Sequence, residues 1–160
     1  MLKYQSYDIV FQEVPGEITL AINIANCPNH CRGCHSTHLW EDRGEPLNEG
    51  SLLALLNLYG NAITCICFMG GDNEPREVER LSLFVRKETK EKLKTAWYSG
   101  KSKLSAEVSC SSFHYIKIGS YIPTFGGLDS PDTNQRFYRI SNDGKMIDET
   151  VRFKKKGVLV

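Results

Sequence analysis

The chain has 160 residues, with 20 Lys and Arg side chains against 19 Asp and Glu. This length suits one domain with a single core, so we expect residues 1–160 to form one domain. The balanced charge supplies no strong field, and we expect neither nucleic acid nor a membrane as a partner. Charged residues interrupt the N-terminal segment, which excludes the apolar core of a signal peptide, and no apolar run approaches the roughly 20 residues of a membrane span. We therefore expect a cytoplasmic protein.

Hydrophobic periodicity predicts a β-hairpin, then alternating helices and strands, and finally a second hairpin. Pro15-Gly16 joins the strands of the first hairpin. Leucines recur at helical spacing in the first helix, with Asn48 or Ser51 as its N-cap and Gly60 as its stop. The expected strands are 4–14, 17–25, 62–69, 94–98, 115–118, 136–140 and 145–151, and the expected helices are 48–59 and 74–92. This alternation is typical of α/β folds, and we expect residues 119–134 to form one long ordered loop.

Three of the six cysteines, Cys27, Cys31 and Cys34, lie within eight residues directly after a predicted strand. Without an export signal, metal binding explains this crowding better than disulfides do. A compact loop of this size can wrap three corners of an iron–sulfur cubane, which leaves one iron without a protein thiolate. Such an open position is where a substrate can bind a metal centre. The alternative is a zinc site in which one histidine adds the fourth ligand, and the candidates are His30, His35 and His38.

The spacing C-x3-C-x2-C is the hallmark of the radical S-adenosylmethionine superfamily. Within it, the chain resembles the activating enzymes of anaerobic (class III) ribonucleotide reductase, and the resemblance covers most of the chain. Beyond the cysteine loop, the matching segments in chain order are Met69-Gly70-Gly71-Asp72, Trp97-Tyr98-Ser99-Gly100, Gly126-Gly127-Leu128-Asp129-Ser130 and Asn134-Gln135-Arg136.

The resemblance implies a partial (β/α) TIM-like barrel of the radical SAM type, open on one side, because 160 residues are too few for a full eight-unit barrel. It implies a [4Fe-4S] cluster on the three cysteines and S-adenosyl-L-methionine as the second cofactor, with no catalytic residue beyond the cluster ligands. The cofactor-binding residues that it suggests are His35, Gly70, Gly71, Asp72 and Ser99. The guanidinium of Arg136 could pair with a carboxylate, and a surface or structural role for Asn134 and Arg136 stays equally open.

The implied reaction begins when one electron from a low-potential donor, such as flavodoxin or ferredoxin, enters the cluster. S-adenosylmethionine is then cleaved to methionine and a 5'-deoxyadenosyl radical, which generates a glycyl radical on the large subunit of the reductase. An open barrel side would admit the glycine-bearing loop of such a partner. Cys31→Ala is expected to abolish cluster assembly and partner activation.

The chain departs from the family pattern at two places. The position before the third cysteine, often aromatic in the superfamily, is Gly33, and we expect His35 to take over part of the adenine contact. The family's Gly-Gly-Glu-Pro is interrupted, so that either Asp72 or Glu74 stands for its acidic residue, and we favour Asp72.

Two other functions remain open. One is a radical enzyme that acts on a small metabolite, such as a deazapurine synthase, and the other is a non-catalytic zinc or iron–sulfur interaction module. Cys65 and Cys67 lie two apart on a predicted strand and share one face, which would allow a second metal site. We expect them, like Cys110 and His114, to be ordinary core residues.

Overall fold

The computed structural model describes residues 1–31 and 37–153, and these form a mixed α/β structure. The strands are β1 (Lys3–Val10), β2 (Thr19–Ile24), β3 (Glu45–Pro46), β4 (Cys65–Met69), β5 (Lys94–Tyr98), β6 (Tyr115–Ile118), β7 (Arg136–Ile140) and β8 (Met146–Asp148). The α-helices are α1 (Glu49–Tyr59) and α2 (Pro75–Glu88), and the short 3₁₀ helices are η1 (Thr37–Trp40), η2 (Cys110–Ser112) and η3 (Thr150–Phe153).

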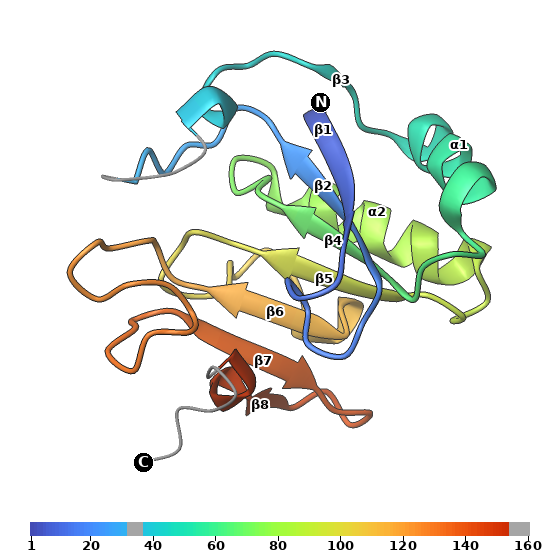
Figure 1. The fold of residues 1–160 in the computed structure, drawn as a ribbon. Coiled ribbons are helices and arrows are strands. Elements are labelled where there is room, and N and C mark those ends of the chain that lie inside the picture. The colour runs from blue at the N-terminus through green and yellow to red at the C-terminus, as the bar shows by residue number, and fades with distance from the viewer. Residues whose placement is uncertain (32–36, 154–160) are drawn as a thin grey trace.

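The strands of the described residues form one eight-stranded sheet in the order β3-β1-β2-β4-β5-β6-β7-β8 (Figure 1). Strands β2, β4, β5 and β6 are parallel and lie side by side in chain order. The outer strands pair antiparallel: β1 lies between β2 and β3 on one side, and β7 lies between β6 and β8 on the other. The carboxyl ends of the four parallel strands therefore meet at one edge of the sheet, where active sites gather in α/β folds.

The two faces of the sheet differ in what covers them. Both helices pack on one face, where leucine, isoleucine and aromatic side chains such as Phe68 and Trp97 form the main core. The opposite face carries a smaller cluster that includes Cys65, Tyr98 and Phe137. Alternation along each strand produces this division, because successive side chains point to opposite faces.

Most predicted elements are confirmed, and the differences lie at their ends. The first helix begins after the N-cap Asn48, whose side chain accepts a bond from the Ser51 amide, and it ends at Gly60 as expected. The second helix ends at Glu88 rather than at 92, because Lys90 and Glu91 have left-handed φ angles of +52° and +63°.

The strands beside the predicted hairpin turns are shorter than the sequence suggested. Strand β1 stops at Val10, and the last strand stops at Asp148 because η3 begins two residues later. Short elements such as β3 and the three 3₁₀ helices have no periodic signal and were not predicted. Residues 119–134 contain no helix or strand, only one isolated bridge between Ile122 and Gly126.

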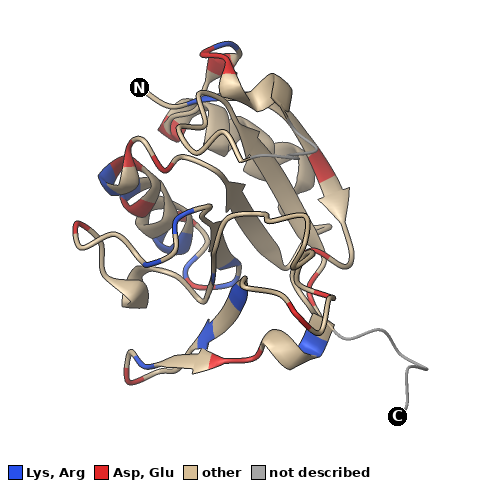
Figure 2. Ribbon diagram, turned by 90° about the vertical axis from the view of Figure 1, so that its left-hand side faces the viewer, with Lys and Arg blue, Asp and Glu red and all other residues tan. Residues whose placement is uncertain are grey.

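The edge strands β3 and β8 each pair with a single neighbour, so the sheet does not close on itself within the described residues. The partial (β/α) barrel expected from the sequence stays a prediction. No helix in this part of the chain is long and apolar enough to cross a bilayer. Charges of both signs are interspersed along the ribbon, including along α2 (Figure 2), in agreement with the near-neutral composition.

Candidate metal centre

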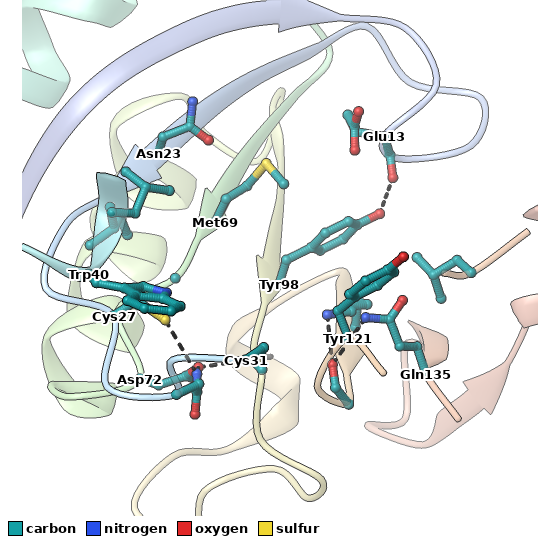
Figure 3. A pocket seen from close by; sticks show the side chains of 18 residues that line it. Glu13, Asn23, Cys27, Cys31, Trp40, Met69, Asp72, Tyr98, Tyr121 and Gln135 are labelled. Atoms are coloured by element: carbon teal, nitrogen blue, oxygen red, sulfur yellow. Dashed lines mark hydrogen bonds between the residues drawn. The ribbon is translucent and has the colours of Figure 1, made fainter. Parts of the chain in front are cut away.

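A cavity of about 540 Å³ lies at the carboxyl ends of the parallel strands. It is lined by residues that follow β2, β4, β5 and β6, among them Cys27, Gly70, Gly100 and Gly119 (Figure 3). Its size falls within the roughly 300–1,000 Å³ of sites that bind small molecules and cofactors. The sheet therefore places the predicted cysteine loop and the first predicted glycine around one space.

Two of the three predicted cluster ligands, Cys27 and Cys31, are free, half-buried thiols that line this cavity. Each directly follows a non-glycine residue with left-handed backbone, Asn26 at φ +59° and His30 at φ +43°. Such conformations cost about 1–3 kcal/mol each and concentrate at functional sites, so the loop is bent sharply where each thiol leaves it.

The third predicted ligand, Cys34, and the predicted adenine contact His35 lie outside the described residues. Among the described residues, no three His, Cys, Asp or Glu side chains group closely enough to hold a metal ion. The alternative zinc ligands His30 and His38 are described. His30 stacks on Trp40 with ring centroids 4.5 Å apart. The complete ligand set stays a prediction.

Asp72 joins the three loops that surround the cavity. Its Oδ2 accepts hydrogen bonds from Asn29 Nδ2 at 2.6 Å and from the Gly100 amide at 2.9 Å. Its Oδ1 accepts from Ser99 Oγ at 2.6 Å. One nearly buried carboxylate thus ties the cysteine loop to the loops after β4 and β5. Hydrogen bonds to an ionised group are the strong ones, so this arrangement fixes the mouth of the cavity.

The predicted cofactor contacts of Asp72 and Ser99 stay untested, and their hydrogen bonds indicate a positioning role. Both oxygens of Asp72 already accept from this chain, and the Ser99 hydroxyl is turned toward Asp72. Glu74, the other candidate for the acidic residue, lies outside the cavity lining and pairs with the N-terminal amine of Met1 at 3.0 Å.

Gly70 and Gly71 both have left-handed φ angles, +113° and +85°. A Cβ on Gly71 would lie 2.5 Å from Cγ2 of Val78 in α2, so only glycine fits this turn. Gly70 lines the cavity, and its carbonyl accepts from Trp97 Nε1 at 2.7 Å. A carbonyl oxygen has two lone pairs and can accept a second hydrogen bond.

Three residues of the site were not identified from the sequence: Asn29, Lys117 and Trp40. Asn29 Nδ2 lies 3.7 Å from Cys27 Sγ, a donor distance typical of sulfur acceptors. Lys117 occupies a position of β6 that faces away from the helices and lines the cavity. The sequence does show a charged lysine inside the short apolar strand 115–118, and this pattern could have identified Lys117 as a site residue.

The Lys117 ammonium is held by the carbonyl oxygens of Gly119 at 2.9 Å and Ser99 at 3.3 Å. Burial lowers the pKa of this lysine, and the nearby acidic groups, Asp72 foremost, oppose that shift. A cation at the cavity complements the negative charge that thiolate ligands bring to an iron–sulfur cluster.

The described residues fit such a cluster. Two thiols line one cavity with a lysine, and one thiol already has an amide donor. The indole nitrogen of Trp40, which also lines the cavity, is buried and has no hydrogen-bond partner among the described residues. A sulfur atom of a bound cluster would supply the hydrogen-bond acceptor that this indole N–H lacks beside the predicted ligand Cys27.

The remaining singled-out residues lie away from the cavity. Cys65 and Cys67 are buried on one sheet face, and burial raises the pKa of both thiols, so they are neutral core groups. Asn134 donates to the Ser120 carbonyl, and Arg136 faces Asp148 at 3.8 Å. Neither residue lines the cavity, although Gln135 between them does, and the carboxylate pairing of Arg136 stays a prediction.

Cys110 and His114 also belong to the structural part of the molecule. Cys110 lies in η2, and its thiol contacts the Gly144 carbonyl oxygen at 3.3 Å. His114 Nδ1 accepts from the Thr95 amide at 3.0 Å, and burial lowers the pKa of its ring.

No curated protein and no solved structure matches the chain. A family model described as a 4Fe-4S single cluster domain matches residues 15–113, more than half of the chain, from the turn before β2 to the residue after η2. The matched segment contains the cysteine loop, the Gly70-Gly71 turn and Ser99. The chain belongs to the family of 4Fe-4S single cluster domains and is an iron–sulfur protein.

Proposed function

We propose that this chain uses its cluster, held by Cys27, Cys31 and Cys34, to cleave S-adenosylmethionine reductively. The 5'-deoxyadenosyl radical so produced would generate a glycyl radical on the large subunit of an anaerobic (class III) ribonucleotide reductase. The observation that carries the proposal is one cavity lined by Cys27, Cys31 and Gly70 and bordered by Asp72, at the edge where parallel strands end. The cysteine spacing and the order of the later motifs supply the resemblance to the activating enzymes.

Three cysteine ligands suit this chemistry because they leave one iron open to the amine and carboxylate of an amino acid. When bound, the reduced cluster supplies one electron to the sulfonium, whose carbon–sulfur bond breaks to give methionine and the radical that removes hydrogen from a glycine Cα. The electron would come from a low-potential donor such as flavodoxin or ferredoxin.

The chain's own residues would bind and orient the second cofactor. The Gly70 carbonyl keeps a lone pair for an ammonium group, and Lys117 supplies a positive charge for a carboxylate. Asp72 holds the cysteine loop against the loop after β5 through Asn29 and Gly100. These contacts would keep the reacting groups in a fixed geometry and limit access by water.

The topology is compatible with a barrel-type enzyme. Strands β2, β4, β5 and β6 follow one another in space in chain order, with both helices on one face. The opposite face carries the smaller cluster that includes Val14, Tyr98 and Phe137, and the sheet does not close on itself within the described residues. An open side of this kind would admit a loop from a large protein substrate.

The test uses anaerobically reconstituted protein, reduced and studied by electron paramagnetic resonance with and without S-adenosylmethionine, while 5'-deoxyadenosine is quantified. We expect a [4Fe-4S]⁺ signal that changes on addition of the cofactor, and deoxyadenosine in the same sample. Adding the reductase should then produce a glycyl radical signal on the partner.

Cys31→Ala is the informative variant and Cys110→Ala its matched control, because both remove one half-buried thiol but only Cys31 lines the cavity. Cys31→Ala should lose the cluster and all deoxyadenosine formation, whereas Cys110→Ala should retain both. A wild-type cluster whose signal ignores S-adenosylmethionine would contradict the proposal and favour an interaction module. Productive cleavage with a small molecule in place of the reductase would move the target to a metabolite.

A further inference from the structure

The two tryptophans of the chain differ in how their indole N–H groups are used. Trp97 Nε1 donates to the Gly70 carbonyl at 2.7 Å. Trp40 Nε1 is buried and has no acceptor within residues 1–31 and 37–153. Buried indole nitrogens nearly always find a partner, since an unsatisfied donor costs about 1–3 kcal/mol. The position of Trp40 therefore calls for an acceptor that residues 1–31 and 37–153 do not supply.

One other buried side-chain atom of the described residues lacks a partner, the hydroxyl oxygen of Thr19. Thr19 is a fully buried residue of β2 that pairs in register with Cys65, and it does not line the cavity. Trp40, by contrast, lines the cavity together with Cys27 and Cys31. Only the unpartnered indole is placed to meet a ligand.

The backbone holds Trp40 beside the first cysteine of the loop. The Asn26 amide donates to the Glu41 carbonyl at 3.0 Å, and the Cys27 amide donates to the Leu39 carbonyl at 2.9 Å. These two bonds bracket Trp40, so its backbone runs alongside Cys27. Figure 3 shows the indole and Cys27 on the same wall of the cavity.

Stacking fixes the orientation of the indole ring. The rings of Trp40 and His30 are nearly parallel, with an interplanar angle of 6° and centroids 4.5 Å apart. His30 immediately precedes Cys31, so the indole ring is held by stacking against the residue before the second cysteine. A ring held in this way presents its N–H in one direction and loses little entropy when an acceptor arrives.

We propose that Trp40 Nε1–H donates a hydrogen bond to a sulfur atom of the bound iron–sulfur cluster, either the Cys27 thiolate or an inorganic sulfide, and thereby raises the reduction potential of the cluster. Reduction adds negative charge to the cluster, and hydrogen bonds to its sulfurs favour that added charge. Asn29 Nδ2, which lies 3.7 Å from Cys27 Sγ, is a second donor of the same kind. The inference rests on the cluster and requires no S-adenosylmethionine chemistry.

The test compares Trp40→Phe with wild type in anaerobically reconstituted holoprotein without S-adenosylmethionine. Phenylalanine keeps an aromatic ring against His30 and removes the N–H. We expect unchanged iron and sulfide content and a lower midpoint potential in a redox titration followed by electron paramagnetic resonance. A tenfold smaller equilibrium constant for one-electron reduction corresponds to about 59 mV. An unchanged potential at full cluster occupancy would overturn the proposal.

Trp97→Phe is the matched control, because it removes the indole N–H that already has a protein acceptor. It should lower the melting temperature of the apoprotein and leave the cluster potential close to wild type. Trp40→Phe should leave the melting temperature of the apoprotein close to wild type and lower the cluster potential. The Trp40 N–H has no acceptor among the described residues until the cluster is bound. A Trp40→Phe apoprotein that loses as much stability as Trp97→Phe would indicate a structural role instead.

A measurement on the wild-type protein covers the case in which Trp40→Phe takes up no cluster. With ¹⁵N at the indole nitrogens, the reduced cluster should show a ¹⁵N hyperfine coupling, because electron density at sulfur reaches a hydrogen-bonded nitrogen. Absence of that coupling would refute the hydrogen bond. Neither readout depends on S-adenosylmethionine, so failure to cleave it would contradict the proposed function and leave this inference standing.

Discussion

The two ends of the parallel strands use polar residues in opposite ways. At the amino ends, the buried Glu17 carboxylate accepts hydrogen bonds from Tyr115 at 2.7 Å, Thr64 at 2.8 Å and Lys94 at 3.0 Å. At the carboxyl ends, the Asp72 network surrounds a cavity, and the indole N–H of Trp40 has no acceptor among the described residues.

This comparison distinguishes the polar residues at the amino ends, which stabilise the fold, from those at the carboxyl ends, which surround a site for a ligand. The Glu17 cluster is closed, because an anion, a cation and two hydroxyls satisfy one another. The groups around the cavity are positioned by the fold, and the Trp40 nitrogen among them has no acceptor in the described residues. Substitutions at the amino ends should therefore change stability alone, and substitutions at the carboxyl ends should change the cluster as well.

The largest loss of stability is expected at the carboxyl ends, from Gly71→Ala. The substitution forces a Cβ into a left-handed backbone and to within 2.5 Å of Val78. Strain and overpacking should together cost about 2–4 kcal/mol, measured by urea unfolding. Gly127→Ala is the control, since its nearest atom would lie at 3.8 Å. Equal stability of the two variants would show that the turn after β4 tolerates a side chain.

Asp72→Ala should cost about 2–3 kcal/mol, because it leaves Asn29, Ser99 and Gly100 without their shared acceptor. Asp72→Asn should recover most of this loss, since the Ser99 hydroxyl can reverse and accept from the new amide. We also expect the Asp72→Ala holoprotein to lose its cluster faster in air, followed by the decay of its visible absorption. If the visible absorption of Asp72→Ala decays at the wild-type rate, Asp72 does not contribute to cluster stability.

Glu17→Gln at the amino ends should cost about 1–2 kcal/mol at pH 7 and leave iron content unchanged. Burial would raise the pKa of Glu17, but the hydrogen bonds from Tyr115, Thr64 and Lys94 outweigh it and hold the pKa below its ordinary 4.5. A lowered folded-state pKa stabilises the protein above pH 4.5, and this stabilisation is lost as the pH falls through the folded value. Urea midpoints of wild type and variant should therefore converge in acid, and a constant gap would contradict this account.

The smallest loss of stability is expected from Arg80→Ala, because Arg80 lies on α2, away from both ends of the parallel strands. Arg80 bridges the helices through Glu49 and Glu77, both at 2.6 Å, but its side chain is 48% exposed. Exposed ion pairs of this kind contribute about 0.5 kcal/mol, and salt screens them. A thermal melt in low and high salt measures this contribution, and a cost above that of Glu17→Gln would reverse the ranking.

The carboxyl end was predictable because its signals are local. Three cysteines lie in one short loop, and Gly70-Gly71 follows an apolar run bounded by turns. The strands and helices were also found, because burial on one face leaves a period in the sequence. The end of α2 was less well predicted, since Thr89 to Glu91 include no glycine or proline that would signal the left-handed turn.

The order of the elements, the cysteine loop and membership of an iron–sulfur family can be recognised from the residues alone, because each depends on residues close together in the chain. Only the tertiary structure brought Glu17 to Lys94 and Tyr115, and Asp72 to Asn29 and Ser99. The physical reason is strand register: β2, β4, β5 and β6 align residues far apart in sequence at each end of the sheet. The same alignment and the backbone bonds beside Cys27 gave Trp40 its place at the cavity, which no local pattern of residues specifies.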